Sequence, residues 1–167
     1  MNFLNEMSRG IKNASTRVVF PEAKEKRIIS AAARAAKQGI AAPILVGKEA
    51  DIRSIATEAG VDLAGIDIVD PALSSRLGFY IDTYCMGNDF PPVAARSILS
   101  KPLYFAAMMV KMGDAESMVA GVVTETEEVV AASKLIIGME EGITTPSGFF
   151  LMDVPGYKGE ELSLIHI

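Results

Sequence analysis

The sequence contains no tryptophan, one cysteine and one histidine among its 167 residues. The single Cys85 cannot form a disulfide within the chain, and such sparse cysteine is typical of a reducing compartment, so we expect a cytoplasmic protein. Because no histidine precedes Cys85 to activate it, we interpret it as a core thiol rather than a nucleophile. The lone His166 lies second from the end, where no general acid or base would be held in place.

Long apolar runs, a basic cluster and the common catalytic motifs are also missing. No run approaches the roughly 20 apolar residues of a membrane span, and the N-terminus lacks a signal-peptide core. No Walker loop, G-x-G-x-x-G turn, H-E-x-x-H helix or paired-cysteine zinc site occurs. The 16 basic and 21 acidic residues give a net charge of −5, without the positive patch that binds a phosphate backbone. We therefore expect neither a membrane nor a nucleic acid as partner.

Half of the residues are hydrophobic, so the chain can bury a core of ordinary size. Short apolar strands alternate with helices, a pattern that predicts βαβ units and therefore an α/β fold with a mainly parallel sheet covered by helices on both faces. The expected strands are 17–20, 43–47, 65–71, 117–120 and 147–153. The expected helices are 1–13, 24–38, 49–59, 74–86, 93–99, 103–112 and 127–137. Helix 103–112 is apolar around most of its circumference, which predicts burial between layers.

The turn at 121–126 is the best candidate for a binding site. Ligands of α/β proteins bind outside the carboxyl ends of parallel strands, and a helix N-terminus offers unpaired backbone N–H groups to an anion. We therefore take Gly121, Thr124 and Thr126 as candidate substrate-binding residues.

An ordinary capped helix start is the alternative interpretation of this turn. Thr124 and Glu127 have the spacing of a capping box. Glu125, Glu127 and Glu128 would satisfy the helix dipole and repel a phosphate there. The residues alone leave both interpretations open.

Several segments resemble the phosphate acetyltransferase and phosphate butyryltransferase family. They lie in the family's order over Ser8 to about Tyr157, and the start Phe20-Pro21-Glu22 and the helix beginning Pro102-Leu103-Tyr104-Phe105 resemble the acetyl branch. The matching segments are RVVFPE at 17–22 with the helix that follows, GIAAPILVG at 39–47, IVDP at 68–71, PLYFAAMMVKMGDA at 102–115, MVAG at 118–121 and SGFFLM at 147–152.

The resemblance implies a reversible acetyl transfer between coenzyme A and inorganic phosphate, with acetyl-CoA and phosphate as substrates and no metal, bound cofactor or covalent acyl-enzyme. A carboxylate would take the thiol proton of coenzyme A, and the thiolate would attack the carbonyl of the acyl phosphate. The implied architecture has two α/β domains of the three-layer, isocitrate/isopropylmalate dehydrogenase-like kind, with the site in the cleft between them. Family members are typically dimeric, so a homodimer is implied. We add Ser147, which opens the last matching segment, to the candidate substrate-binding residues.

The resemblance also implies a domain division. We expect residues 1–145 to form most of the first domain and 146–161 to begin the second. The last six residues, 162–167, resemble a translated transposon-end adapter used in sequencing libraries; a native strand is the alternative. The serine, arginine and aspartate that carry the family's reaction are expected outside this chain, which would then be inactive alone.

Three places depart from the family pattern. Where members commonly have histidine or asparagine after the turn and arginine further into the helix, this chain has Thr124 and Ala131, and the arginine usual near 84–88 is absent. Alternatives therefore stay open: a phosphate butyryltransferase, a regulatory phosphotransacetylase-like domain of a malic enzyme, or a non-catalytic small-molecule-binding α/β module. The acidic turn and the absent arginines favour the last of these.

Overall fold

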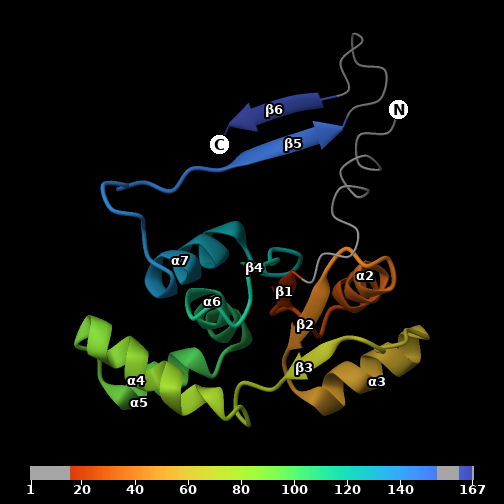
Figure 1. The fold of residues 1–167 in the computed structure, drawn as a ribbon, viewed down its shortest axis with the longest axis horizontal. Helices are drawn as coiled ribbons and strands as arrows, with labels where there is room; N and C mark the ends of the chain where they lie inside the picture. The colour runs from red at the N-terminus through yellow and green to blue at the C-terminus, as the bar shows by residue number, and fades with distance from the viewer. Residues whose placement is uncertain (1–15, 154–161, 167) are drawn as a thin grey trace. The chain divides into compact units, whose positions relative to one another are not determined.

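The computed structural model describes residues 16–153 and 162–166. It divides into two compact units, Asn13–Gly138 and Met1–Lys12 with Met139–Ile167, and each is described by itself. The expected helix at 1–13 lies outside the described residues. The larger unit contains, in chain order, β1 (Arg17–Phe20), α2 (Lys26–Lys37), β2 (Ala42–Val46), α3 (Glu49–Ala59), β3 (Asp67–Val69), α4 (Arg76–Asn88), α5 (Pro92–Leu99), α6 (Pro102–Lys111), β4 (Ser117–Met118) and α7 (Thr126–Ile136) (Figure 1).

The four strands of this unit form one parallel sheet in the order β3-β2-β1-β4. The chain runs outward from β1 to β3, and then returns through α4, α5 and α6 to place β4 on the other side of β1. The strand order therefore reverses between β1 and β4, and such a reversal is a topological switch point at which α/β proteins bind ligands. The predicted parallel sheet is confirmed.

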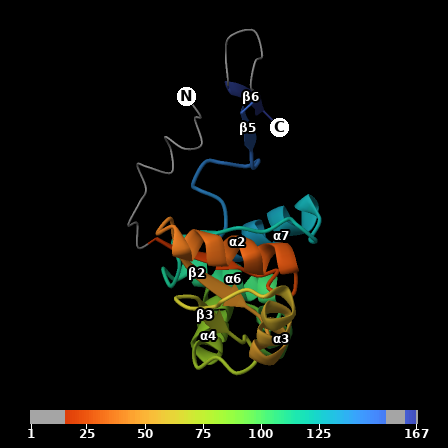
Figure 2. The ribbon, with the colours of Figure 1, turned by 90° about the vertical axis from the view of Figure 1, so that its right-hand side faces the viewer.

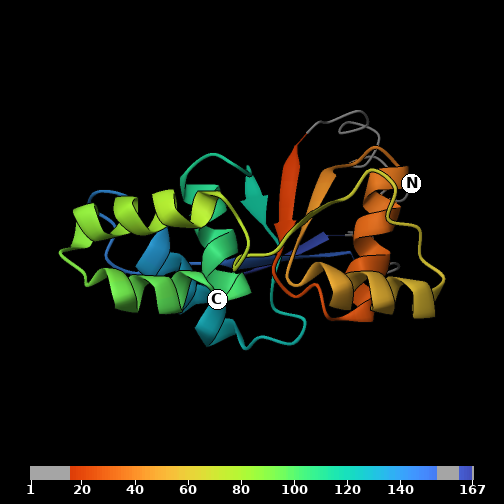
Figure 3. The ribbon, with the colours of Figure 1, turned by 90° about the horizontal axis from the view of Figure 1, so that it is seen from below.

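Helices cover both faces of the sheet because successive strand residues point to opposite sides. Val19, Ile44 and Val46 belong to a core cluster with residues of α4, α5, α6 and α7. Phe20 and Leu45 belong to a second cluster with residues of α2 and α3. Figure 3 shows α2 and α3 on one side of the strands and α4, α5 and α6 on the other, and Figure 2 looks onto the face that α2 and α3 cover. The larger unit thus has the three layers expected of the fold.

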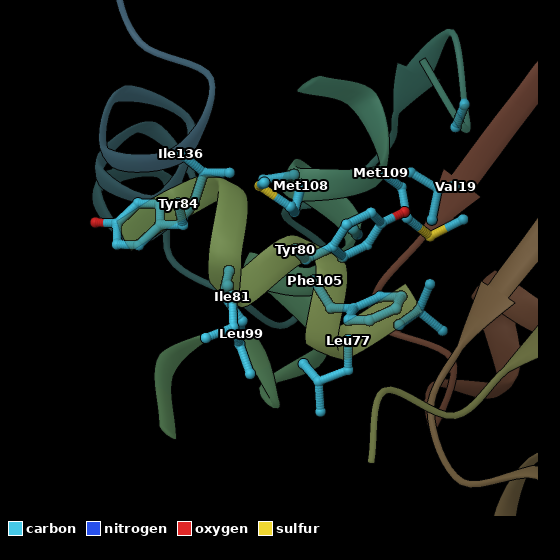
Figure 4. Packing of buried hydrophobic residues seen from close by; sticks show 14 of the residues in the cluster. Val19, Leu77, Tyr80, Ile81, Tyr84, Leu99, Phe105, Met108, Met109 and Ile136 are labelled. Carbon is cyan, nitrogen blue, oxygen red and sulfur yellow. The ribbon is translucent and has the colours of Figure 1, made fainter. Parts of the chain in front are cut away.

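The core against α6 confirms that this helix is buried. Phe105 and Met108 are at most 1% exposed, and the Phe105 ring lies 5.1 Å from the Tyr80 ring, centroid to centroid (Figure 4). Burying each such side chain contributes about 1.5–3 kcal/mol. Cys85 is half-buried and packs against the same cluster, which agrees with its interpretation as a core thiol.

Strands β3 and β4 are shorter than the sequence predicts. Only Asp67–Val69 pair with β2, and only Ser117 and Met118 pair with β1 as ladder partners. After Val119 donates its N–H to Val19, the chain leaves the sheet at Gly121, whose φ of 106° is a conformation that side chains with a Cβ rarely adopt. The early end of β4 brings the following turn directly over the end of β1.

A network of charges at the amino ends of β1 and β4 fastens α4 to the loop before β4. The Arg76 guanidinium donates to both oxygens of Asp114, with Nη2 2.7 Å from Oδ1 and Nε 3.0 Å from Oδ2, and the Tyr80 hydroxyl also donates to Asp114. Burial raises the pKa of Asp114, but these donors outweigh it and leave the pKa below its usual value. The network lies at the edge of the sheet opposite the switch point.

The described part of the smaller unit contains β5 (Phe149–Asp153) and β6 (Leu162–His166), which pair antiparallel with Phe149 opposite His166. The strand expected at 147–153 is confirmed over Phe149–Asp153, and it begins two residues later than expected. Residues 162–166 adopt the strand conformation that was the alternative at this position, and the adapter origin of the last six residues stays a prediction. Over the described residues, no helix combines the length and the apolar character needed to cross a membrane.

Candidate functional site

A pocket of about 480 Å³ opens at the carboxyl edge of the sheet, around the switch point between β1 and β4. The residues after β1 and β2, the start of α6 and the β4–α7 turn meet there. Its lining residues are Pro21, Glu22, Lys24, Glu25, Val46, Gly47, Lys101, Pro102, Leu103, Tyr104, Val123, Thr124 and Glu128.

Glu22 occupies the centre of this edge. It follows β1 directly after Pro21, and at 7% exposure it is the one buried polar or charged residue of the described chain. Its carboxylate accepts four hydrogen bonds from successive backbone N–H groups of the turn after β4. Oε2 accepts from Gly121 at 3.1 Å and Val122 at 2.9 Å, and Oε1 accepts from Val123 at 2.9 Å and Thr124 at 2.7 Å.

Hydrogen-bond donors of this turn hold Glu22 in its ionised form. Burial raises the pKa of the carboxyl, because a low-dielectric environment disfavours the charge. The backbone N–H groups of Thr124, Val122 and Val123, together with the Thr124 hydroxyl, outweigh burial and lower the pKa from 4.5 to about 2. The turn is therefore an anion-binding loop whose anion is a side chain of the same chain.

The structure corrects the sequence analysis on two points in this turn. The N–H groups of Gly121 and Thr124, which we expected to be unpaired, donate to Glu22. The expected capping box between Thr124 and Glu127 is wrong, because α7 begins at Thr126 with Glu125 as N-cap and no side-chain capping bond. Thr124 precedes the N-cap residue Glu125 and therefore does not occupy the capping position.

The remaining lining of the pocket is apolar with a charged rim. Val46, Leu103 and the 64%-exposed Val123 contribute apolar surface. On the rim, Lys24 Nζ lies 2.9 Å from Asp51 Oδ2. Lys101 Nζ instead lies 5.8 Å from the centroid of the Tyr104 ring. Among the described residues that line the pocket, the cationic ones are Lys24 and Lys101, and none is an arginine.

Three of the four candidate residues lie at or beside this pocket. Thr124 lines it, Gly121 belongs to the same turn, and Thr126 is the first residue of α7. Ser147 belongs to the smaller unit. Contact of these four residues with a substrate stays a prediction.

Sequence reasoning missed the two charged residues that the structure makes prominent. Glu22 could have been found from its place immediately after a buried strand, where carboxyl-edge residues of α/β proteins face a ligand site. Lys101 had a weaker signal, as the residue before the proline that opens α6. Within the described residues, no three histidine, cysteine, aspartate or glutamate side chains converge as a metal site would require.

Comparisons with known proteins bear on the same region. The family described as phosphate acetyl/butaryl transferase matches residues 2–164. A phosphate acetyltransferase from Acetivibrio thermocellus is 35% identical over 158 residues, which cover 93% of this chain and 47% of the relative. One from Treponema pallidum is 36% identical over 157 residues, covering 92% and 47%. The chain thus spans about half the length of these curated relatives.

Solved structures give the same match. A phosphotransacetylase from Staphylococcus aureus superposes with a TM-score of 0.84 at 25% identity, covering 96% of this chain and 48% of that one. A phosphotransacetylase from Streptococcus pyogenes superposes with a TM-score of 0.85 at 26% identity, covering 96% and 49%.

Proposed function

Because this chain belongs to the phosphate acetyl/butaryl transferase family, we propose that the complete protein that carries it transfers an acetyl group reversibly between coenzyme A and inorganic phosphate. The observation that carries the proposal is the pocket at the switch point, in a chain that matches phosphate acetyltransferases over 93% of its length. The acetyl rather than the butyryl substrate is supported by the names of the curated relatives.

The proposed reaction is a direct displacement in a complex that holds both substrates. Toward acetyl-CoA, the coenzyme A thiol loses its proton to a base and the thiolate attacks the carbonyl carbon of acetyl phosphate. A C–S bond forms, the C–O bond to phosphate breaks, and inorganic phosphate leaves with the electron pair. Donors around the carbonyl oxygen and the phosphate stabilise the charge that develops in the transition state.

This chain is proposed to supply one wall of the site. Gly121, Thr124, Thr126 and Ser147 remain the candidate contacts to substrate, and coenzyme A acts as substrate rather than bound cofactor. We place the groups that transfer protons in the part of the relatives that this chain does not cover. We further propose that the complete protein is a homodimer and that it acts in the cytoplasm. The cytoplasmic location is supported by the single cysteine.

Lys101 is the cation of the pocket that we propose to attract the phosphate. Lys24 is already paired with Asp51, whereas Lys101 lines the pocket beside Tyr104. Replacing Lys101 with methionine in the complete protein is expected to raise KM for phosphate about tenfold, the loss of one charge-assisted contact worth about 1.4 kcal/mol. Steady-state kinetics with varied phosphate measures it, and Lys134→Met on α7, outside the pocket, is the matched control. An unchanged KM for phosphate in Lys101→Met would exclude this role.

The proposed activity is tested by mixing the complete protein with acetyl phosphate and coenzyme A and following the thioester that forms. We expect acetyl-CoA to appear with an equal amount of phosphate. Butyryl phosphate in place of acetyl phosphate serves as the competing substrate, and a higher kcat/KM for it would replace acetyl with butyryl. Binding of coenzyme A without any thioester would contradict the proposal.

A further inference from the structure

The β4–α7 turn presents four successive backbone N–H groups to one point, and that point is filled by Glu22. The two carboxylate oxygens each accept two of these hydrogen bonds, at 2.7–3.1 Å. A phosphate or another oxyanion is the usual ligand of such a group of N–H donors at the start of a helix. Here the ligand position belongs to a residue about a hundred positions earlier in the chain.

The backbone around Glu22 is buried and fixed by a hydrogen bond. Pro21, Glu22 and Ala23 are all buried, and the Glu22 carbonyl accepts the N–H of Glu25 at 2.9 Å, which fixes the backbone as α2 begins. An incoming anion that displaced the carboxylate would leave a buried charge without its four donors, and an unpaired buried charge is strongly unfavourable. Displacement of Glu22 from the turn by an anion is therefore unfavourable.

The carboxylate also joins the two strands of the switch point. Glu22 follows β1, and the four N–H groups follow β4, so these hydrogen bonds fix the end of one strand against the end of the other. Both Val123 and Thr124 face the pocket while their N–H groups face Glu22. The shape of this pocket wall thus depends on Glu22.

We propose that Glu22 is a positioning residue that fills the anion-binding turn permanently, so that the turn is in its working shape before substrate arrives and a substrate phosphate binds outside these four N–H groups. The inference rests on the proposed function for the identity of the substrate. A turn that is already ordered spares the substrate the entropy of ordering it.

A first test follows the carboxylate itself and needs no catalysis. The complete protein is labelled with ¹³C at glutamate carboxyls, the Glu22 resonance is assigned by its loss in Glu22→Gln, and inorganic phosphate or acetyl phosphate is added to saturation. We expect the Glu22 resonance to stay where it was in the substrate-free protein. Movement of the resonance to the position of a solvent-exposed glutamate would show displacement and overturn the inference.

A second test asks whether the position, rather than stability alone, matters to the reaction. In Glu22→Ala, measured where circular dichroism shows the protein folded, kcat is expected to fall about 100-fold. Added formate, which carries a carboxylate into the vacated position, should then restore kcat at least tenfold in a saturable manner. Asp114→Asn is the matched control: it removes a paired carboxylate at the opposite edge, and its kcat should stay within threefold of wild type and not respond to formate.

The outcomes separate the inference from the proposed function. A wild-type protein without acetyl transfer refutes the function, while the ¹³C resonance and the formate-dependent rise in melting temperature of Glu22→Ala still test the inference. If Glu22→Ala does not fold, Glu22→Asp, which keeps the charge on a shorter side chain, is expected to retain more activity than Glu22→Gln. Folded, active wild type together with a Glu22→Ala or Glu22→Gln variant of unchanged kcat would overturn it.

Discussion

Replacing Glu22 with glutamine is expected to lower the free energy of unfolding of the 167-residue chain by roughly 3 kcal/mol at pH 7. The glutamine amide nitrogen cannot accept a hydrogen bond, so at least two of the four N–H groups that now donate to Glu22 would face another donor. Urea unfolding followed by tyrosine fluorescence measures the effect, since the chain has no tryptophan and Tyr80, Tyr84 and Tyr104 lie in the larger unit.

The pH dependence of this difference has a defined sign. The pKa of Glu22 is lowered from 4.5 to about 2 by folding, so its contribution to stability is complete above the unfolded value. It decreases as the pH falls from about 4.5 to about 2, because the unfolded chain takes up the proton first. The gap between wild type and Glu22→Gln should therefore narrow across this range.

The exposed Glu128, which lines the same pocket, provides the control. Glu128→Gln is expected to change the free energy of unfolding by no more than about 0.5 kcal/mol, as exposed substitutions usually do. A Glu22→Gln variant as stable as wild type at pH 7 would mean that the four hydrogen bonds do not hold the turn.

Replacing Val123 with tryptophan, whose larger side chain would fill the pocket, is expected to lower kcat/KM for acetyl transfer by the complete protein about 100-fold. The Val123 side chain lines the pocket and is 64% exposed. Tryptophan at this position can therefore occupy the pocket without overpacking the core, and the Val123 N–H can still donate to Glu22. Steady-state kinetics measures the loss of kcat/KM, which should be large. A thermal melt measures the change in melting temperature, which should be small.

Val122→Trp is the matched control for Val123→Trp. Val122 is the preceding residue of the same turn, is 39% exposed and does not line the pocket. We expect its kcat/KM to stay within threefold of wild type. Equal losses in the two variants would place the reaction away from this pocket.

Much of the larger unit could be predicted from the sequence, because its local signals agree with its tertiary packing. The strand at 17–20 and the helix at 49–59 were predicted with the bounds that β1 and α3 have. The parallel sheet could be predicted from the alternation of strands and helices, because a helix that crosses over the sheet between two strands returns the chain so that the strands run parallel. Burial of the helix at 103–112 could be predicted because the helix is apolar around most of its circumference.

The centre of the candidate site could not be predicted from local patterns. The spacing of Thr124 and Glu127 indicated a capping box, but the Thr124 N–H is taken by Glu22, 102 residues earlier in the chain. A contact over such a separation depends on β1 and β4 lying side by side, which the sequence pattern does not specify. In the structure the carboxylate of Glu22 occupies the N–H groups that the sequence offered to an anion, and substrate contact at the turn stays a prediction.

The family resemblance predicted the fold and the family, which the match over residues 2–164 confirms. It did not predict which cation would attract the phosphate in the absence of the arginines usual in the family. In the structure Lys101 lies at the rim of the pocket. The proposed acetyl transfer therefore takes place at a site whose cation is this lysine.

Phosphorus NMR of the complete protein with acetyl-CoA and inorganic phosphate follows the proposed acetyl transfer itself. We predict that an acetyl phosphate resonance grows in step with the release of coenzyme A thiol, and that it grows about 100-fold more slowly with Val123→Trp than with Val122→Trp. A folded protein that binds coenzyme A but yields no acetyl phosphate resonance would contradict the proposed acetyl transfer.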